Sequence, residues 1–280
     1  MKNNKLLNFK NNKINSSLIL SSPHSGSFYP KDFLSLSNIQ LPDLIQNEDS
    51  LVDHLIDGTL DNNNIVLKAV WSRSVVDVNR AINDFHHNDF DPPIIDLEPL
   101  PTKYARSGIG VIPIRSGIND KMYISKLPGG VGMKWLNLAW KNYHSTLNNL
   151  LKKTYSKFGH YVLFDFHSMP SLSENKKKHA DIVLGDCHGK SIGSNFIDFV
   201  ETQLKNSGLN IKRNSPYSGG YITEHYGKPK EGKHTIQIEI NRSIYLNEKS
   251  REKNSNFEEC KKLLSELINQ FEKNKLNLLS

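Results

Sequence analysis

The sequence predicts an α/β protein in which buried strands alternate with amphipathic helices. Short runs of apolar, β-branched and aromatic residues are typical of buried strands. Longer segments carry apolar residues at helical spacing, as in helices that pack one face against a sheet. The chain has 280 residues, and no linker-like segment divides it. We therefore expect a single domain over residues 17–280, preceded by a disordered or irregular tail at residues 1–16.

The stretch from Tyr161 to Pro170 is the clearest predicted strand. It begins as an apolar and aromatic run and ends with Asp165, His167, Ser168 and a proline, a residue that cannot donate to a strand ladder. Ligands of open α/β sheets bind at the carboxyl ends of the strands, so His167 lies where chemistry is expected. Taken alone, His167 is explained equally well by a local hydrogen bond at a strand end. Further strands are predicted at residues 17–22, 65–71, 75–80, 180–185 and 234–242.

Helices are predicted where apolar residues recur every three or four positions. The first follows Glu48 and Asp49, acids that interact favourably with a helix N-terminus. Apolar residues from Leu136 to Leu151 mark a long helix that closes near Gly159. The remaining two predicted helices cover residues 192–204 and 257–271.

Composition argues against several classes of protein. The apolar runs are shorter than the roughly 20 residues that span a bilayer. Residues 1–16 lack the apolar core of a secretory signal, so we expect a cytoplasmic location. The two cysteines, Cys187 and Cys260, have no C-x-x-C partner, which excludes a disulfide framework and argues against a thiolate metal cluster. Pro128–Gly132 lacks the Gly-Lys-Ser/Thr ending of a phosphate loop, and we interpret it as a turn.

Charge points to a small anionic substrate more than to a macromolecular partner. Lys and Arg total 36 against 29 for Asp and Glu, a formal net charge of +7. The excess is dispersed, and no basic helix is interleaved with stacking aromatic residues, so we interpret it as a solvated surface. We expect neither nucleic acid nor membrane as a partner, and the positive balance suits an anionic small molecule.

Polar side chains with catalytic potential gather at the exits of the predicted strands and at one helix start. The set comprises His24, Glu48, Asp49, Asn79, Arg80, His167, Glu239, Asn241 and Arg242. Two histidines and one carboxylate are a common catalytic zinc set with a fourth position for water. A separate carboxylate then serves as general base, and arginines supply forked donors for a substrate carboxylate. The joint pattern favours a metal hydrolase.

Each of these residues also has a simpler explanation when it is considered alone. His24 could be a turn residue, and Asp49 could cap a helix. Glu239 and Arg242 could form a surface ion pair.

Eight segments of the chain carry a connected set of motifs. In chain order they are Ser22–Gly26, Glu48–Asp53, Val76–Arg80, Gly108–Pro113, Asp165–Ser171, Asp181–Asp186, Asn214–Tyr221 and Gln237–Tyr245. These motifs resemble those of the N-formylglutamate amidohydrolases, from about residue 17 to residue 246. The resemblance implies a fold like that of the zinc carboxypeptidases (phosphorylase/hydrolase-like), a mixed and mostly parallel sheet flanked by helices. It also implies zinc-dependent hydrolysis of N-formyl-L-glutamate to formate and L-glutamate, the last step of one route of histidine degradation.

The resemblance also implies roles for individual residues. One Zn²⁺ would be held by His24, Asp49 and His167, and Glu239 would be the general base. Asn79 and Arg80 would bind the substrate carboxylate. Beyond the resemblance, we expect Arg242 as a further donor to the substrate, and we expect the segment from Tyr221 to Tyr226 to line the pocket for the formyl group.

One position departs from the related carboxypeptidases. Their acidic ligand follows the first histidine by three residues, where this chain has Ser27. The acid must therefore come from a later segment. We choose Asp49 because it lies at a predicted helix start, with Glu48 and Asp53 as rivals. Asp165 and Asp53 are alternatives for groups that orient a histidine ligand.

Two other functions are compatible with these residues. The first is an amidohydrolase of the same fold acting on another N-acyl amino acid or on a cell-wall amide, although a cytoplasmic location argues against a cell-wall substrate. The second is a metal-free module that binds carboxylates. The presence of both histidines and Glu239 argues against that module.

Overall fold

The structure is a computed structural model that describes residues 7–10, 14–57, 64–116, 121–173 and 175–278. The chain divides into two compact units, each assembled from separate stretches. The first contains Met1–Asn8, Pro23–Glu48 and Lys68–Asn148, and the second contains Phe9–Ser22, Asp49–Leu67 and Asn149–Ser280. Because neither unit is continuous in sequence, the division does not correspond to two successive domains. The single domain over residues 17–280 stays a prediction.

In the described part of the chain, seven strands form one sheet in the order β1-β3-β2-β4-β7-β5-β6. The pairs β2–β4, β4–β7 and β5–β6 are parallel, and β5 runs antiparallel to β7. These pairings confirm the expected α/β fold with a mixed, mostly parallel sheet. The strands are β1 (Leu7–Lys10), β2 (Leu18–Ser22), β3 (Ile65–Ala69), β4 (Tyr161–Met169), β5 (Ile182–Gly185), β6 (Ile211–Arg213) and β7 (Lys233–Asn241).

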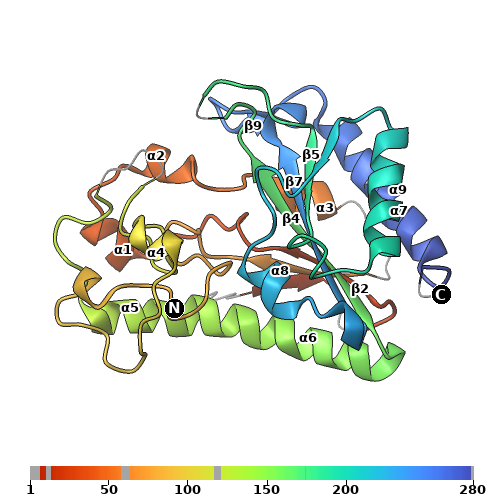
Figure 1. Cartoon of the computed structure of the whole chain (residues 1–280). Helices are drawn as coiled ribbons and strands as arrows, with labels where there is room; N and C mark the ends of the chain where they lie inside the picture. Colours follow the sequence, from red (N-terminus) through yellow and green to blue (C-terminus); the bar gives the residue numbers. More distant parts are fainter. Residues whose placement is uncertain (1–6, 11–13, 58–63, 117–120, 174, 279–280) are drawn as a thin grey trace. The chain divides into compact units, whose positions relative to one another are not determined.

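β4 and β7 lie side by side in the middle of this sheet (Figure 1) and are almost wholly buried. Successive side chains of a strand point to opposite faces. Phe164 and Phe166 therefore face one way, and Asp165 and His167 face the other. The parallel register sets His167 beside Glu239. One face of the central strands is thus apolar, and the other becomes polar toward the carboxyl ends.

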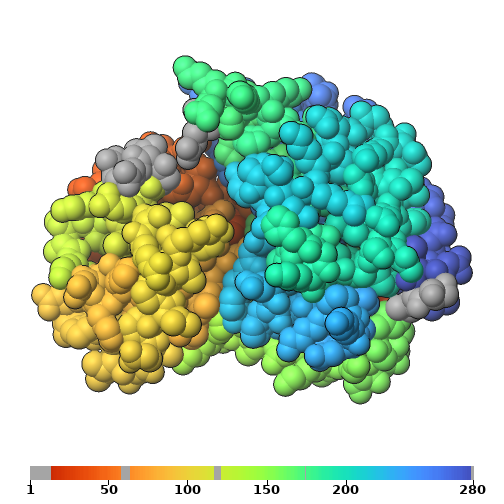
Figure 2. All heavy atoms as spheres, in the orientation of Figure 1, coloured from red at the N-terminus to blue at the C-terminus, as the bar shows by residue number. Residues whose placement is uncertain are grey.

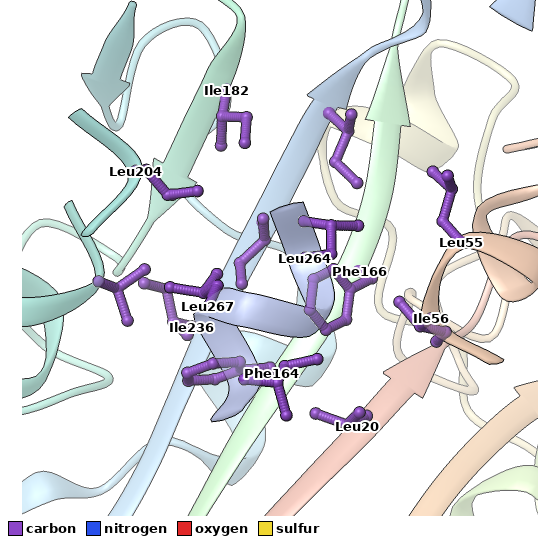
Figure 3. Packing of buried hydrophobic residues seen from close by; sticks show 14 of the residues in the cluster. Leu20, Leu55, Ile56, Phe164, Phe166, Ile182, Leu204, Ile236, Leu264 and Leu267 are labelled. Atoms are coloured by element: carbon purple, nitrogen blue, oxygen red, sulfur yellow. The ribbon is translucent and has the colours of Figure 1, made fainter. Parts of the chain in front are cut away.

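The apolar face is covered by helices of the second unit, α3 (Val52–Ile56), α7 (Ser194–Asn206) and α9 (Phe257–Asn274). Figure 3 shows the aromatic rings of β4 among the leucines of α9. The ring centroids of Phe164 and Phe271 are 4.8 Å apart. Burying each large apolar side chain contributes about 1.5–3 kcal/mol. The predicted helices at residues 192–204 and 257–271 are confirmed as α7 and α9.

The first unit is built from short helices and long loops. Its helices are α1 (Lys31–Leu36), α2 (Leu41–Ile45), the 3₁₀ turn η2 (His87–Asp89), α4 (Lys103–Arg106) and α5 (Gly129–Trp135). An aromatic cluster of Phe33, Tyr123 and Trp135 packs inside it. α5 continues through a π-helical segment, Leu136–Lys141, into α6 (Asn142–Phe158), which confirms the predicted long helix.

The smaller elements lie between these. They are α8 (Tyr221–Tyr226), η4 (Pro229–Glu231), η5 (Arg242–Ile244), and the hairpin of β8 (Leu246–Asn247) and β9 (Glu252–Lys253). The loop between β4 and β5, green at the top of Figure 2, exposes Lys176, Lys177 and Lys178, as expected of a solvated surface. In the part of the chain that is described, no helix has both the length and the apolar character to cross a membrane.

Three expectations from the sequence differ from the structure. Residues 75–80 do not form a strand: the Asp77 amide donates to the Val111 carbonyl at 2.8 Å, and the other bonds are turns. Val75, Val76 and Val78 are buried, and buried β-branched residues give the same pattern in a packed turn as in a strand.

Gly129 begins α5, so the expected turn there is wrong. Residues 7–10 of the expected irregular tail form β1, and residues 1–6 and 11–13 lie outside the described part.

Candidate active site

His24 directly follows β2 in a bend and is 2% exposed. Its Nε2 lies 2.7 Å from Oδ1 of Asp77, in the same unit. Close packing positions the bend, because a Cβ on Gly26 would lie 2.3 Å from the carbonyl oxygen of Trp71. Only glycine leaves room for that approach. The bend thus presents the imidazole to a buried carboxylate.

Asp77 is ionised and orients His24. Burial alone raises the pKa of Asp77, but the nearby charges of His24 and two arginines outweigh burial and hold it well below its usual range. Arg73 donates to Oδ2 at 2.9 Å, and the Asn79 amide donates to Oδ1 at 2.9 Å. An ionised Asp77 accepts the Nε2 proton of His24, so Nδ1 is the nitrogen that can bind a metal ion.

His167 has the same arrangement in the second unit. Its Nε2 lies 3.0 Å from Oδ2 of Asp165, and its Nδ1 lies 3.2 Å from Oδ2 of Asp49. Ser21 donates to the other oxygen of Asp165. Burial alone lowers the pKa of His167, but the hydrogen-bonded carboxylates outweigh burial and raise it well above its usual value. Carboxylates that stabilise a proton on this imidazole would equally stabilise a metal cation beside it.

Of the three acids considered as metal ligand, Asp49 contacts His167, and its rivals Glu48 and Asp53 have other surroundings. Glu48 is in the first unit, where it accepts a hydrogen bond from the Tyr29 hydroxyl. Asp53 is more exposed and lies 4.0 Å from His54. Within the described residues of the second unit, Asp49 is thus favoured over Asp53 as the acidic partner of His167. Our reason for choosing it was wrong, however, since α3 begins at Val52 and has only five residues. Side-chain contacts, not a helix start, position this carboxylate.

Side chains of the second unit form a buried, acidic cluster around His167. Asp49, Asp165 and Glu239 contribute three carboxylates and Arg242 one guanidinium, all at most 7% exposed. The raised pKa of His167 favours a proton that metal binding would have to displace, and once His167 is neutral these four groups carry two more negative than positive charges. Burying such an excess is costly unless a cation balances it. The cluster therefore has the charge that suits a divalent metal ion.

Within this cluster, Glu239 is held in a defined orientation. The side-chain amide of Gln237 donates to its Oε1 at 2.6 Å. Thr223, in turn, donates to the Gln237 carbonyl oxygen at 3.4 Å. Glu239 is 6% exposed and Arg242 is 7% exposed, so the explanation of these two residues as a surface ion pair is wrong. A buried carboxylate next to a candidate metal-binding histidine is suited to take a proton from water.

Asn79 and Arg80 lie on a rigid turn of the first unit. The Arg80 guanidinium stacks 3.8 Å from the ring centroid of Tyr104, and its Nη1 donates to the Asn79 carbonyl at 3.1 Å. The turn is also held by the long helix: Trp140 donates to the Arg80 carbonyl at 2.8 Å, and the His144 ring lies 2.7 Å from the Val78 carbonyl. A stacked and braced guanidinium is suited to bind a carboxylate.

The other two predicted substrate residues lie in the second unit. Arg242 donates to Asp49 and Ser168. Tyr221 begins α8 and is half-buried, with its ring stacked on His225 at 4.9 Å. Burial raises the pKa of Tyr221, so the hydroxyl keeps its proton at neutral pH.

Sequence reasoning gave no role to three residues that contact the predicted site: Asp77, Ser168 and Gln237. All three stand inside the quoted motifs, at Val76–Arg80, Asp165–Ser171 and Gln237–Tyr245. The only indication in the sequence that they contact the site was that they lie close to candidate site residues along the chain. Asp77 and Ser168 contact residues distant in sequence, so these contacts were not predictable. Gln237 bonds to Glu239, two positions away in the same strand.

Buried imidazoles and carboxylates at the carboxyl ends of strands in a mixed α/β sheet are characteristic of hydrolases that use a metal ion. The fold and the site thus define the class of protein, an α/β enzyme of the hydrolase type with a candidate metal centre.

The comparison with known proteins is consistent with this class and gives the family. The model of the N-formylglutamate amidohydrolase family matches residues 16–246. The chain therefore belongs to the N-formylglutamate amidohydrolase family, hydrolases that act on an amide bond. This confirms the resemblance seen in the motifs.

Two curated relatives match along most of their length. The chain is 29% identical over 257 residues to an N-formylglutamate deformylase of Pseudomonas putida, covering 87% of this chain and 86% of the relative. It is 25% identical over 252 residues to an N-formylglutamate deformylase of Pseudomonas aeruginosa, covering 88% and 87%.

Solved structures share the fold. A crystal structure of an N-formylglutamate amidohydrolase from Ralstonia eutropha JMP134 matches with a TM-score of 0.88 and 28% identity, covering 96% of this chain and 99% of that one. A gene product of Agrobacterium tumefaciens matches with a TM-score of 0.65 and 16% identity, covering 96% of both chains, a likeness that shows the fold alone.

Proposed function

We propose that this protein is a zinc-dependent amidohydrolase that cleaves N-formyl-L-glutamate to formate and L-glutamate. The observation that carries the proposal is the match, over most of both chains, to relatives named N-formylglutamate deformylase. The reaction would be the last step of one route of histidine degradation.

The metal would be held by His24, Asp49 and His167, a group of buried residues with one ligand atom each. Each histidine has its Nε2 against a separate aspartate, so each offers Nδ1. Two imidazole nitrogens and one carboxylate oxygen are a ligand set that zinc accepts, with a fourth position for water. A zinc ion bound there would polarise the formyl oxygen and lower the pKa of its water to about 7.

Glu239 would move the proton in this reaction. Its carboxylate takes a proton from the attacking water and passes it to the leaving nitrogen of glutamate. The Gln237 amide occupies one oxygen of Glu239 and fixes the plane of the carboxylate. We assign the transferred proton to this carboxylate.

Arg80 and Asn79 would anchor a carboxylate of the substrate. The Tyr104 ring holds the guanidinium plane, which lowers the loss of conformational freedom when a carboxylate binds. A substrate without that carboxylate would forgo the charge-assisted hydrogen bonds to Arg80 and bind more weakly. Tyr221 and its helix would line the space for the formyl group and exclude larger acyl groups.

Formate release from N-formyl-L-glutamate, measured with and without a chelator, tests the proposal. We expect activity that the chelator abolishes and that added Zn²⁺ restores. Glu239→Gln should lower turnover about 10²–10⁴-fold and leave metal binding intact. Glu231→Gln, a change in an exposed ion pair with Lys233, is the matched control and should leave turnover unchanged.

Other outcomes would favour the other functions. Faster hydrolysis of another N-acyl amino acid in a substrate panel would favour an amidohydrolase of different specificity. A purified chain that contains no metal and binds N-formyl-L-glutamate without hydrolysis would favour the carboxylate-binding module.

A further inference from the structure

Arg242 lies immediately after β7, where it forms a closed network with two residues of the second unit. Its Nε donates to the Ser168 hydroxyl oxygen at 3.0 Å, and its Nη2 donates to Asp49 Oδ1 at 3.1 Å. The Ser168 hydroxyl donates to the same oxygen of Asp49 at 3.1 Å. All three residues are at most 7% exposed. We propose that Arg242 positions the metal ligand Asp49 and is not a substrate-binding residue, an inference that rests on the proposed function.

The two oxygens of Asp49 have separate roles in this network. Oδ1 accepts both hydrogen bonds, from Arg242 and from Ser168. Oδ2 lies 3.2 Å from Nδ1 of His167. Two ligand atoms that share a tetrahedral zinc ion, each about 2.0–2.1 Å from the metal, lie about 3.3 Å from one another. The separation of Oδ2 and Nδ1 is compatible with both atoms holding one metal ion, and Oδ2 is the oxygen of Asp49 that would bind it.

The network also fixes the position of Asp49 relative to His167, the other candidate ligand of this unit. Ser168 follows His167 in β4, so the hydroxyl that braces Asp49 comes from the strand that carries the imidazole. Arg242 closes the link from the start of η5, directly after the neighbouring strand β7. The spacing between Oδ2 and Nδ1 is thus set by the sheet and not by the loop that carries Asp49.

A guanidinium suits this task better than an ammonium group. Nε and Nη2 are fixed in one plane, so a single side chain satisfies two acceptors at a defined angle. The charge also offsets that of the ligand carboxylate where no bulk water does so. Arg242 donates to the candidate ligand Asp49 and to Ser168, which also bonds to Asp49. Arg80 donates instead to the backbone carbonyls of Ile109 and Asn79, and this difference is the reason to separate the two roles.

The Zn²⁺ affinity of Arg242 variants shows whether Arg242 positions a metal ligand or binds the substrate. Zn²⁺ affinity would be measured on the full-length protein, stripped with a chelator, by competition with a fluorescent zinc indicator. Arg242→Lys should weaken affinity about 10-fold and Arg242→Gln up to about 100-fold, because groups that hold a ligand have effects of this size. Ser168→Ala should weaken it about 10-fold. At saturating Zn²⁺ the KM for N-formyl-L-glutamate should change less than about 2-fold in Arg242→Lys.

Arg251→Gln is the matched control. Arg251 donates to the Ser50 hydroxyl at 3.0 Å. It thus holds the residue next to Asp49 through the Ser50 side chain and not through the Asp49 carboxylate. Its replacement should leave Zn²⁺ affinity within about 2-fold of the parent protein, because it does not act on the carboxylate. An equal loss of affinity in this control would overturn the inference, since general order of the loop would then be the cause.

The remaining outcomes distinguish this inference from the proposed function. Unchanged Zn²⁺ affinity with a KM raised about 10-fold or more in both Arg242 variants would make Arg242 a substrate-binding residue. If the parent protein binds no Zn²⁺, the proposed function itself fails, and Arg242 has no ligand to position. Should Arg242→Gln not fold by circular dichroism, Arg242→Lys and Ser168→Ala still decide the question.

Discussion

His234, in β7, is a buried histidine that the fold holds in its neutral form. Its Nδ1 accepts a hydrogen bond from the Gly193 amide at 3.1 Å, and its ring centroid lies 4.5 Å from that of Phe196. Burial, together with the charge of His160, lowers its pKa from 6.5 to about 4. Protonation at Nδ1 would break the bond from Gly193. Acid should therefore weaken the contact between β7 and the start of α7.

The expected loss of stability follows from the two pKa values. The unfolded chain binds a proton at His234 near pH 6.5, and the folded chain does so only near pH 4. The stabilisation is complete above pH 6.5 and is lost as the pH falls toward 4. The difference between the two values corresponds to about 3 kcal/mol for a fully shielded group. Screening by nearby solvent reduces the expected loss to about 2 kcal/mol.

His234→Asn removes the titration and keeps an acceptor. The Asn Oδ1 can take the place of Nδ1 and accept from Gly193, but it binds no proton in this range. We expect the variant to be less stable than the parent at neutral pH, because it loses the ring that packs on Phe196. The stability difference between the two proteins should shrink by about 2 kcal/mol between about pH 7.5 and pH 4.5.

Urea unfolding of the metal-free parent and variant across that range measures this difference. His54→Asn, a change at an exposed histidine of the same unit, is the control and should show the parent's pH dependence. The reasoning is refuted if parent and His234→Asn curves run parallel with pH. An NMR titration that gives His234 a pKa at or above 6.5 would refute it as well.

Three further predictions concern the first unit. Asp77→Asn should weaken Zn²⁺ affinity about 10–100-fold, because the amide no longer fixes the imidazole tautomer; Asp84→Asn, at another buried aspartate, is the control in the same indicator assay. Arg80→Lys should raise the KM for N-formyl-L-glutamate about 10-fold or more with Zn²⁺ affinity unchanged, since the stacked fork is lost. Gly26→Ala should lower the free energy of unfolding in urea by about 1–3 kcal/mol through its clash with a carbonyl. Gly130→Ala, which meets no atom within 4 Å, should not lower it.

The architecture was largely predictable because burial leaves a periodic pattern. β4, α7 and α9 have the positions that their apolar spacing indicated. The same kind of pattern wrongly predicted a strand at residues 75–80, where three valines are buried. Hydrophobicity reports that a residue is inside and does not report which backbone groups bond to each other. A turn tied to Val111 and a strand therefore look alike in sequence.

The sequence did not determine which acid is the partner of His167. Glu48, Asp49 and Asp53 lie within six positions and have the same chemistry. The spacing gave no reason to separate them beyond a helix start that the structure puts three residues later. Contact with His167, which is 118 positions away, favours Asp49 over Asp53.

The amino-acid sequence alone determined the α/β class, the main helices, the central strands and the kinds of side chain that reach the strand ends, because these depend on local periodicity and composition. Tertiary structure decided which of those side chains meet. It paired Asp77 with His24, and it turned Arg242 toward Asp49. A hydrogen bond between residues far apart in the chain depends on strand order and register, which local sequence does not encode.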